Sequence, residues 1–451
     1  LAQLDQNSIA SSRELLNRFV SFYSNASYTY DDKYVLSGSI RWDRSNLWGT
    51  NSKYQNKPLW SVGGSWNIYK EKFFQADFVD MLKLRASYGI GGNIGRNTAP
   101  YLIASYYDSS LVDGMAGSVN TPPNKDIRWE KTTTVNVGVD FALFRHRLSG
   151  TIEYYNKYSV DLLAAINGSP TQGFGYTTLM TNNGKMVNRG VEITLSGEII
   201  RQKDFSWNAS LLYAFNRNKV KHISVQPSLW DSRISMPTSY PMVGKPLYGI
   251  YAYKWAGLNE NGDPQVYDAE NNVTSGPARD YHALVYCGTT VPIHNASLTN
   301  VLRYKGFEFS AMLILDAGHK LRSSNIPSIN MSNGRITSTA KGIVDRWTQP
   351  GDVTDVPRLL FSNDTENFNT HRTELYRYSD LFVYDASNIR LSNISLAYRV
   401  PAHWCKKISL SGARLQFNVE NVATFAFDSK ANYDLGGKMK PNYVWGLYLN
   451  F

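Results

Sequence analysis

Few side chains in this sequence are spaced for catalysis. Its seven histidines, two cysteines and scattered carboxylates form no HExxH zinc motif, no nucleophile elbow, no CxxC pair and no phosphate loop. The glycine-rich run at residues 89–93 ends a strand pattern and leads into a loop rather than a helix, so it lacks the context of a phosphate-binding loop. We therefore expect no enzyme, no catalytic residue and no cofactor-binding residue.

Aromatic side chains between the strand patterns are the better candidates for binding. Flat rings can stack on sugars or grip peptide side chains beside hydrogen-bonding amides. The alternative for each ring is that it packs its own loop or lies in the aromatic girdle of a membrane interface. The candidates are Trp48, Tyr54, Tyr106, Tyr107, Phe174, Tyr176 and Trp230.

The elements that would carry these loops are strands. In residues 133–141 the odd positions are Thr, Val or Phe and the even positions are Thr, Asn, Gly and Asp, the period of two of a strand with one apolar and one polar face. After the polar turn at residues 145–147, residues 148–163 run back with a similar alternation. One such hairpin fits a soluble sandwich, whose apolar face meets a second sheet, as well as an outer-membrane barrel, whose apolar face meets lipid.

The number of strands and the length of their connections separate these alternatives. About 13 strands are predicted, and short turns alternate with long loops, as in an up-and-down outer-membrane barrel. Sandwich domains in series would not sort their connections by length. The strands lie at residues 19–30, 34–43, 59–69, 82–91, 133–141, 148–163, 191–196, 207–216, 298–304, 307–315, 389–400, 413–425 and 443–451, and the long loops include 164–188, 219–296 and 318–386.

Composition fits the barrel. The 451 residues include 30 Tyr, 11 Trp and 19 Phe, and no stretch approaches the 18 uncharged apolar residues of a membrane-spanning helix. The mean hydropathy of -0.36 decides nothing, because alternation hides the membrane face of a barrel. The lysines and arginines behind the net charge of +10 are scattered through turns and loops, so we expect no binding of nucleic acid. The milder interpretations of this charge are attraction to acidic surface glycans or lipopolysaccharide, and ordinary solubility. Cys287, in a predicted loop, and Cys405, in a short turn, should lie at opposite ends and not pair.

The C-terminal pattern also favours a barrel. Residues 443–451 alternate and end on the aromatic Phe451. A last amphipathic strand closing on Phe is the pattern that the outer-membrane assembly machinery recognises, and the alternative is a buried C-terminal strand of a soluble β domain.

Several blocks, in order along the chain, resemble the SusC/RagA type of TonB-dependent transporters of the Bacteroidetes outer membrane. The likeness runs from about residue 18 to residue 451. The blocks are LKLRASYG at residues 82–89, NKDIRWEKT at 124–132, VGVDF at 137–141, GTIEYYNK at 150–157, NRGVE at 188–192, RWT at 346–348, IRLSNISL at 389–396 and QFNVENVAT at 416–424.

The resemblance implies an incomplete transporter. Family members carry a plug domain, a TonB-interacting segment and further strands ahead of this region, and about 13 strands do not reach the roughly 22 of a plugged barrel. Residues 1–451 would then be the C-terminal part of the transmembrane β-barrel with long extracellular loops, and the start at Leu1 suggests a fragment or a processed product. The implied partners are the N-terminal plug and barrel portion, the TonB complex acting through it, a SusD-like surface lipoprotein as lid, outer-membrane lipid, and an oligosaccharide or peptide substrate.

One loop departs from the family pattern. Where relatives often carry a calcium-loop-like run, this chain has Asn-Glu-Asn-Gly-Asp-Pro at residues 259–264, and Pro264 breaks the alternating ligand spacing. We therefore expect a plain turn rather than Ca²⁺ in residues 259–270.

The combined interpretation is an all-β, antiparallel, up-and-down transmembrane barrel portion of an active importer of oligosaccharides or oligopeptides in the outer membrane. The alternatives are a porin or surface adhesin without a plug, and a soluble glycan-binding protein of several sandwiches. The choice between sugar and peptide stays open, because aromatic, amide-rich loops serve both.

Overall fold

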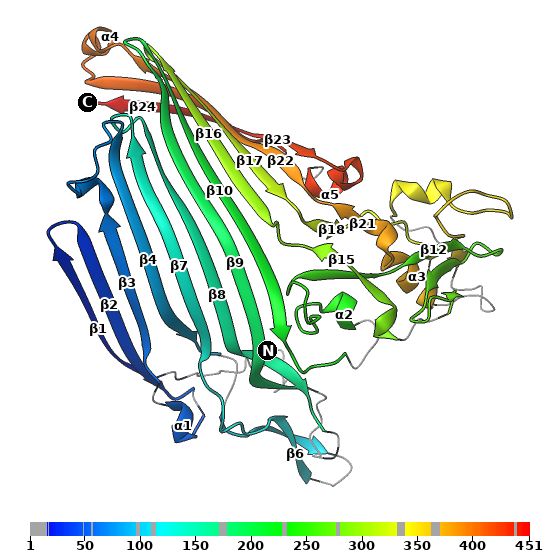
Figure 1. The fold of residues 1–451 in the computed structure, drawn as a ribbon. Coiled ribbons are helices and arrows are strands. Elements are labelled where there is room, and N and C mark those ends of the chain that lie inside the picture. The colour runs from blue at the N-terminus through cyan, green and yellow to red at the C-terminus, as the bar shows by residue number, and fades with distance from the viewer. Residues whose placement is uncertain are drawn as a thin grey trace, which may run out of the picture.

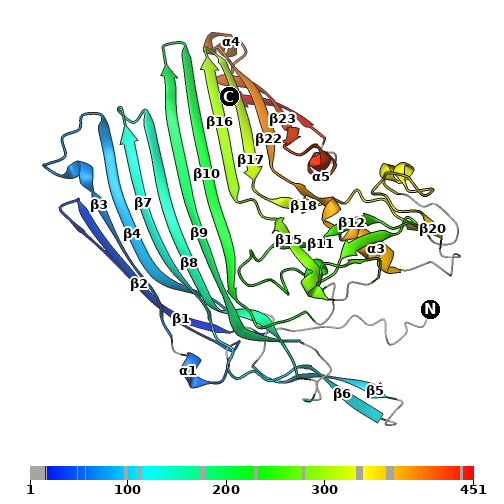
Figure 2. The ribbon, with the colours of Figure 1, turned by 45° about the vertical axis from the view of Figure 1, so that its right-hand side comes forward.

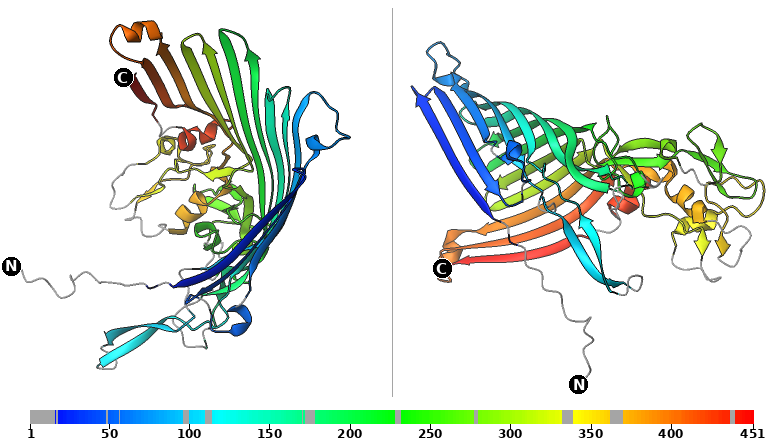
Figure 3. Two further views of the ribbon diagram at one scale, coloured as in Figure 1. Left: turned by 90° about the vertical axis from the view of Figure 1, so that its left-hand side faces the viewer. Right: turned by 90° about the horizontal axis from the view of Figure 1, so that it is seen from below.

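One antiparallel sheet of 13 strands dominates the protein (Figure 1). The computed structural model describes residues 16, 18–47, 49–55, 57–95, 100–109, 114–169, 171, 178–227, 232–276, 280–331, 339–361, 370–436 and 440–451. The strands neighbour one another in chain order, and the sheet is curved (Figure 3). They are β1 (Phe19–Tyr30), β2 (Tyr34–Ser45), β3 (Leu59–Asn67), β4 (Val79–Asn93), β7 (Glu130–Leu143), β8 (Leu148–Asn167), β9 (Thr178–Arg201), β10 (Phe205–His222), β16 (His294–Tyr304), β17 (Phe307–Ala317), β22 (Asn388–Val400), β23 (Gly412–Ala426) and β24 (Asn442–Asn450).

All 13 predicted strands are confirmed, and the structure extends several of them. The prediction of residues 191–196 becomes the 24-residue β9. In contrast, the strand predicted at residues 59–69 ends at Asn67, because the next residues form a 3₁₀ turn, Ile68–Lys70.

The period of two gives the sheet two chemically different faces. Val137, Tyr154 and Val191 face each other across β7, β8 and β9, and the first two are 46% and 45% exposed. One position along, Gly138 pairs with Glu153 on the opposite face. A broad surface of exposed apolar side chains on one face needs lipid or another apolar partner. We call the face that carries Val137, Tyr154 and Val191 the apolar face, and the face that carries Glu153 the polar face.

Tight turns join the strands at one end of the sheet. Asp31 and Asp32, between β1 and β2, both have φ of 51°, the left-handed conformation of the turns that suit a twisted hairpin. The connection from β22 to β23 contains the short helix α4 (Ala402–Lys406). Cys405 lies on this helix and is buried.

The opposite end carries the long connections, which are folded rather than open loops (Figure 2). This corrects the prediction for residues 219–296 and 318–386, whose described parts form a small subdomain. Its strands are β11 (Gly249–Tyr253), β12 (Trp255–Leu258), β13 (Pro264–Tyr267), β14 (Val273–Thr274), β15 (Leu284–Thr289), β18 (Lys320–Arg322), β19 (Asn330–Met331), β20 (Leu360–Phe361) and β21 (Val383–Asp385), and its helices are α2 (Ser232–Ser235) and α3 (Thr370–Arg377). Elsewhere at this end lie α1 (Ser52–Gln55), the hairpin β5 (Ile103–Ser109) and β6 (Gly114–Thr121), and α5 (Asn432–Leu435).

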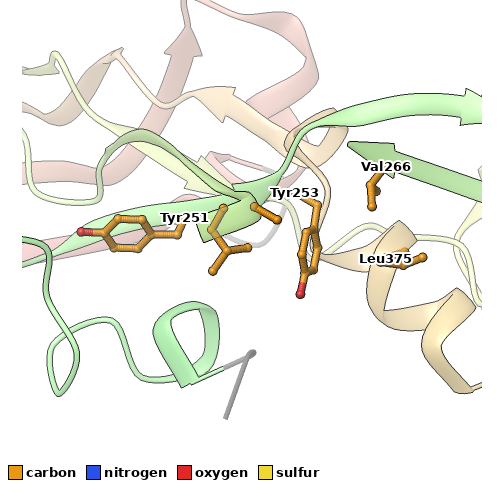
Figure 4. Close-up of a cluster of buried hydrophobic side chains, with 6 residues drawn as sticks. Tyr251, Tyr253, Val266 and Leu375 are labelled. Atoms are coloured by element: carbon orange, nitrogen blue, oxygen red, sulfur yellow. The ribbon is translucent and has the colours of Figure 1, made fainter. Parts of the chain in front are cut away.

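The subdomain has its own hydrophobic core. Tyr251 and Tyr253 of β11, Val266 of β13 and Leu375 of α3 are each at most 1% exposed (Figure 4). Burying a large apolar side chain contributes roughly 1.5–3 kcal/mol, so a cluster of this size can hold the subdomain together. Cys287 lies on β15, not in a loop as predicted, and the prediction that it does not pair with Cys405 is confirmed.

Among the described residues no helix has the length and apolar character needed to cross a bilayer.

Candidate functional site: the polar face and the long-loop end

An ion-paired cluster occupies the polar face of β4, β7 and β8. Arg85 Nε lies 3.2 Å from Asp140 Oδ2, and Arg85 Nη2 lies 2.9 Å from Glu153 Oε2. Asn136 Nδ2 donates to Glu153, and Thr151 Oγ1 donates to Asp140 over 3.0 Å. Asp140 and Glu153 thus each accept from one charged and one neutral donor, and these hydrogen bonds offset the cost of removing the carboxylates partly from water.

A glycine makes room for this arrangement. A Cβ at Gly138 would lie 3.0 Å from Cζ of Arg85, closer than a carbon can comfortably approach. The Arg85 guanidinium therefore lies over Gly138 of β7 and reaches Asp140 on the same strand and Glu153 on β8. The even positions in residues 134–140, predicted as the polar face, supply Asn136 and Asp140 to the cluster and Gly138 to the space that Arg85 occupies.

Further along the same face, a shallow groove of about 360 Å³ lies over β9, β10, β16 and β17. Glu192, Asn295 and Asp316 are among its lining residues. Asn295 Nδ2 donates to Asp316 Oδ1 over 2.7 Å. The polar face thus carries carboxylate and amide groups, and no group of three metal-ligating side chains occurs on it or elsewhere in the described residues.

A partly buried ion cluster holds segments of the subdomain together at the long-loop end. Asp263 accepts from Arg372 Nε over 2.7 Å and from Arg358 Nε and Nη2 over 3.0 and 2.8 Å. Arg372, whose side chain is 3% exposed, also donates to Asn330 Oδ1 and to the carbonyl of Arg358. Burial lowers the pKa of Arg372. The cluster joins α3 to the start of β13.

The same cluster bears on the calcium prediction. Residues 259–263 form a turn in which Asn259 Oδ1 accepts the backbone N–H groups of Asn261 and Asp263. The Asp263 carboxylate that could have served an ion is bound by two arginines. The expectation of a plain turn is consistent with these contacts, and the absence of calcium stays a prediction.

Burial shifts the pKa of two more side chains in the subdomain, Arg322 and Cys287. Arg322 on β18 donates to the carbonyls of Tyr251, Arg377 and Ser379, so it ties three segments together, and burial lowers its pKa. Burial raises the pKa of the Cys287 thiol to about 11. A neutral thiol is a poor nucleophile, so burial makes the Cys287 thiol less reactive than an exposed one.

One carboxylate connects the subdomain to the last loop of the chain. Asp434 on α5 accepts from the hydroxyl groups of Ser323 and Ser324, over 2.8 and 2.6 Å, and from the backbone N–H of Ser324 over 3.0 Å. The loop between β17 and β22 is thereby joined to the loop between β23 and β24.

The three predicted aromatic residues that the structure describes, Tyr54, Tyr106 and Tyr107, lie at the long-loop end, on two separate elements, α1 and β5. Tyr54 on α1 is half-buried, and the Arg128 guanidinium lies 4.6 Å from its ring centre, while Lys53 and Lys57 lie 5.8 and 5.7 Å away. Arg128 also pairs with Asp161 over 2.8 Å. Tyr54 therefore lies against cations of its own loop and against Arg128, and a binding role for it stays a prediction.

Tyr106 and Tyr107 are different, because they stand on the projecting β5–β6 hairpin and are 73% and 52% exposed. As adjacent strand residues they point to opposite faces of the hairpin. Phe451 directly follows β24 and is 91% exposed. Trp48, Phe174, Tyr176 and Trp230 lie outside the described residues.

Sequence reasoning missed the subdomain and its ion cluster. Asp263 and Arg372 are 109 residues apart, and neither stands in a recognisable motif. The available signal was the run of strand-forming residues at Gly249–Tyr253 and Leu284–Thr289, which pair as β11 and β15.

The chain matches known outer-membrane receptors over nearly its whole length. The family described as TonB dependent receptor-like, β-barrel, matches residues 4–422. TonB-dependent receptor P3 of Formosa agariphila is 27% identical over 456 residues, which cover 95% of this chain and 43% of the relative. TonB-dependent receptor SusC of Bacteroides thetaiotaomicron is 25% identical over 427 residues, which cover 90% of this chain and 40% of SusC.

The fold has the same relatives. The structure of the RagAB peptide transporter superposes with a TM-score of 0.77 at 23% identity, covering 96% of this chain and 48% of that chain. The chain thus spans less than half the length of the proteins it matches. The strand pattern, the two-faced sheet and these matches agree, and the chain belongs to the TonB-dependent receptor-like β-barrel family as an outer-membrane protein of the SusC/RagA type.

Proposed function

We propose that the chain is the C-terminal barrel portion of a TonB-dependent importer that moves oligosaccharides or oligopeptides across the outer membrane, with transport rather than catalysis as its role. In this proposal an N-terminal portion supplies the plug and the remaining strands. The TonB complex acts on that plug, and a SusD-like lipoprotein covers the long-loop end.

The observation that carries the proposal is the curved sheet with a charged inner wall and two open edges. Among the described residues, β1 and β24 each pair on one side only. Unpaired backbone groups are not tolerated in membrane hydrocarbon, so further strands must cover these edges. The ion cluster of Arg85, Asp140 and Glu153 gives the enclosed space a polar wall, as a solute pathway requires.

The long-loop end supports the proposal for substrate and lid. The subdomain is a folded platform at the mouth of the wall, and the β5–β6 hairpin projects beside it (Figure 2). The exposed rings of Tyr106 and Tyr107 are suited to stacking on a sugar or a peptide side chain. We assign them to substrate or lid contact, together with Trp48, Phe174, Tyr176 and Trp230.

The test is uptake by cells that carry the complete transporter. Labelled oligosaccharide and oligopeptide mixtures are supplied to cells with and without a functional TonB complex. Uptake of one mixture that stops without TonB is expected, and the mixture that enters identifies the substrate class. Uptake that continues without TonB would instead identify a passive pore.

A second experiment addresses the lid and the aromatic residues. A surface lipoprotein should co-purify with the complete transporter in mild detergent. Tyr106→Ala combined with Tyr107→Ala should lower uptake severalfold, while Tyr248→Ala, which removes a ring that is 50% exposed elsewhere at this end, should not. Equal uptake by all variants would remove Tyr106 and Tyr107 from the proposed site.

A further inference from the structure

A strongly basic cavity is lined by the middle of β9, the end of β10 near the long loops, β15 and the segments 244–246 and 291–293. Figures 1 and 2 show β15 near this part of β10. Its volume is about 610 Å³, and none of the described residues that line it carries a carboxylate. Where cationic groups in it have close contacts, the partners are neutral: Arg189 Nε donates to Asn156 Oδ1, and Lys245 Nζ lies 4.8 Å from the ring centre of Tyr286. Its five cationic side chains are Arg189, Arg217, Lys219, Lys221 and Lys245.

The strand register places this cavity on the apolar face. Phe215 pairs with Val191, Arg217 with Arg189 and Lys219 with Val187, without a register shift between them. Residues two apart on a strand share a face, so Arg217 and Lys219 continue the row of Phe215. The acidic groove around Glu192 lies on the opposite face.

Three aromatic rings lie next to the basic cavity, on the side nearer the short-turn end of the sheet. His294 lies beside Phe215 and Tyr213, with ring centres 5.3 and 6.2 Å apart, and its Nδ1 is 2.9 Å from the Tyr213 hydroxyl. Aromatic girdles mark the border between hydrocarbon and headgroups in outer-membrane barrels. Because a strand rises about 3.3 Å per residue, Arg217 and Lys219 lie roughly 7 and 13 Å along the strand beyond Phe215, at the level of the headgroups.

This position decides which anion the cavity suits. Five neighbouring cations favour a ligand with several negative charges, and Lys and Arg are common phosphate ligands. A transported anion would travel along the polar face, whereas this cavity faces the lipid. We propose that it binds the phosphate groups of an anionic glycolipid of the lipopolysaccharide class in the outer leaflet, with the acyl chains of that lipid against Tyr213 and Phe215.

The test uses the complete protein extracted from outer membranes and stripped of bound lipid. Binding of diphosphoryl lipid A and of dephosphorylated lipid A is measured in one detergent by native mass spectrometry. Each cation near an anionic lipid surface contributes a factor of about five, so Arg217→Gln, Lys219→Gln and Lys245→Gln together should weaken binding of the diphosphoryl form about 100-fold. The swap Arg217→Lys, Lys219→Arg and Lys245→Arg keeps the charge and should retain most of the binding.

The matched control removes three exposed cations at the short-turn end, through Lys305→Gln, Lys406→Gln and Lys407→Gln, and should leave binding unchanged. If the cavity triple variant does not fold, the single change Lys219→Gln replaces it, with an expected loss of about fivefold. Equal binding of dephosphorylated lipid A, equal loss in the control, or binding of inorganic phosphate without binding of lipid A each overturns the proposal.

Discussion

Replacing Arg372 with Met should loosen the subdomain at the long-loop end while the barrel wall stays intact. The change keeps most of the side-chain volume but removes three donors, to Asp263 Oδ1, Asn330 Oδ1 and the Arg358 carbonyl. Because the Arg372 side chain is 3% exposed, water cannot easily replace it. Asp263 keeps its two hydrogen bonds from Arg358, so its charge stays paired. The cost is that of the lost hydrogen bonds to charged groups, about 1.5–3 kcal/mol.

Hydrogen–deuterium exchange of the complete protein in detergent measures this loss locally. Since about 1.4 kcal/mol changes an opening equilibrium tenfold, exchange in β13 and α3 should accelerate by roughly one to two orders of magnitude, up to the limit set by intrinsic exchange. Exchange in β7 and β8 should not change, because the wall has its own hydrogen bonds.

Arg377→Met is the matched control, since Arg377 is on the same helix but exposed. A surface change of this kind should alter the opening free energy by no more than about 0.5 kcal/mol. If Arg372→Met and Arg377→Met accelerate exchange equally, the buried ion cluster does not hold the subdomain.

Three further outcomes are expected. Gly190→Ala should cost about 1–3 kcal/mol of stability and lower the unfolding temperature in heat-modifiability gels, because a Cβ there would overlap the Tyr155 ring and lie 2.6 Å from the Phe215 carbonyl oxygen. The control Gly64→Ala, whose Cβ would have its nearest contact at 3.6 Å, should not lower the unfolding temperature. Burial raises the pKa of Cys287 to about 11 from an ordinary 9.0, so its thiolate fraction at pH 8 falls about 100-fold. Labelling of this thiol by iodoacetamide should therefore be slow at pH 8, faster as the pH rises towards 11, and fast at pH 8 only in denaturant. Fast labelling of Cys287 in the folded protein at pH 8 would contradict the burial argument. Deleting Phe451, whose side chain is 91% exposed, should reduce the amount of assembled protein in the outer membrane without changing the unfolding temperature of what is assembled, and normal assembly would remove its role as a signal.

The sheet could be predicted because its information is local. Alternation in residues 133–141 is imposed by the two faces of one strand, and short polar turns fix which strands are neighbours. The polar-face cluster was partly foreseeable for the same reason, since Asp140 and Glu153 lie at polar positions of a predicted hairpin. That Arg85 would lie between them depends on the register of a third strand and on the absence of a side chain at Gly138.

The subdomain could not be predicted because its contacts join distant segments. Trp255 N–H donates to Asp380 Oδ1, and Tyr253 N–H to the carbonyl of Tyr378, across more than a hundred residues. Its strands are two to six residues long, too short to show a clear period. For the aromatic candidates, residue type indicated a binding role, but only coordinates separate the exposed Tyr106 from Tyr54, which is packed against Arg128.

The contact of Asp434 with Ser323 and Ser324 has a consequence for the order of assembly. Along the chain, the serines precede the carboxylate that binds them by about 110 residues. Until α5 arrives with the β23–β24 hairpin, this side of the subdomain lacks its partner. The subdomain at the long-loop end therefore reaches its final shape only once the connection between β23 and β24 has docked against it, which couples its folding to the pairing of these two strands.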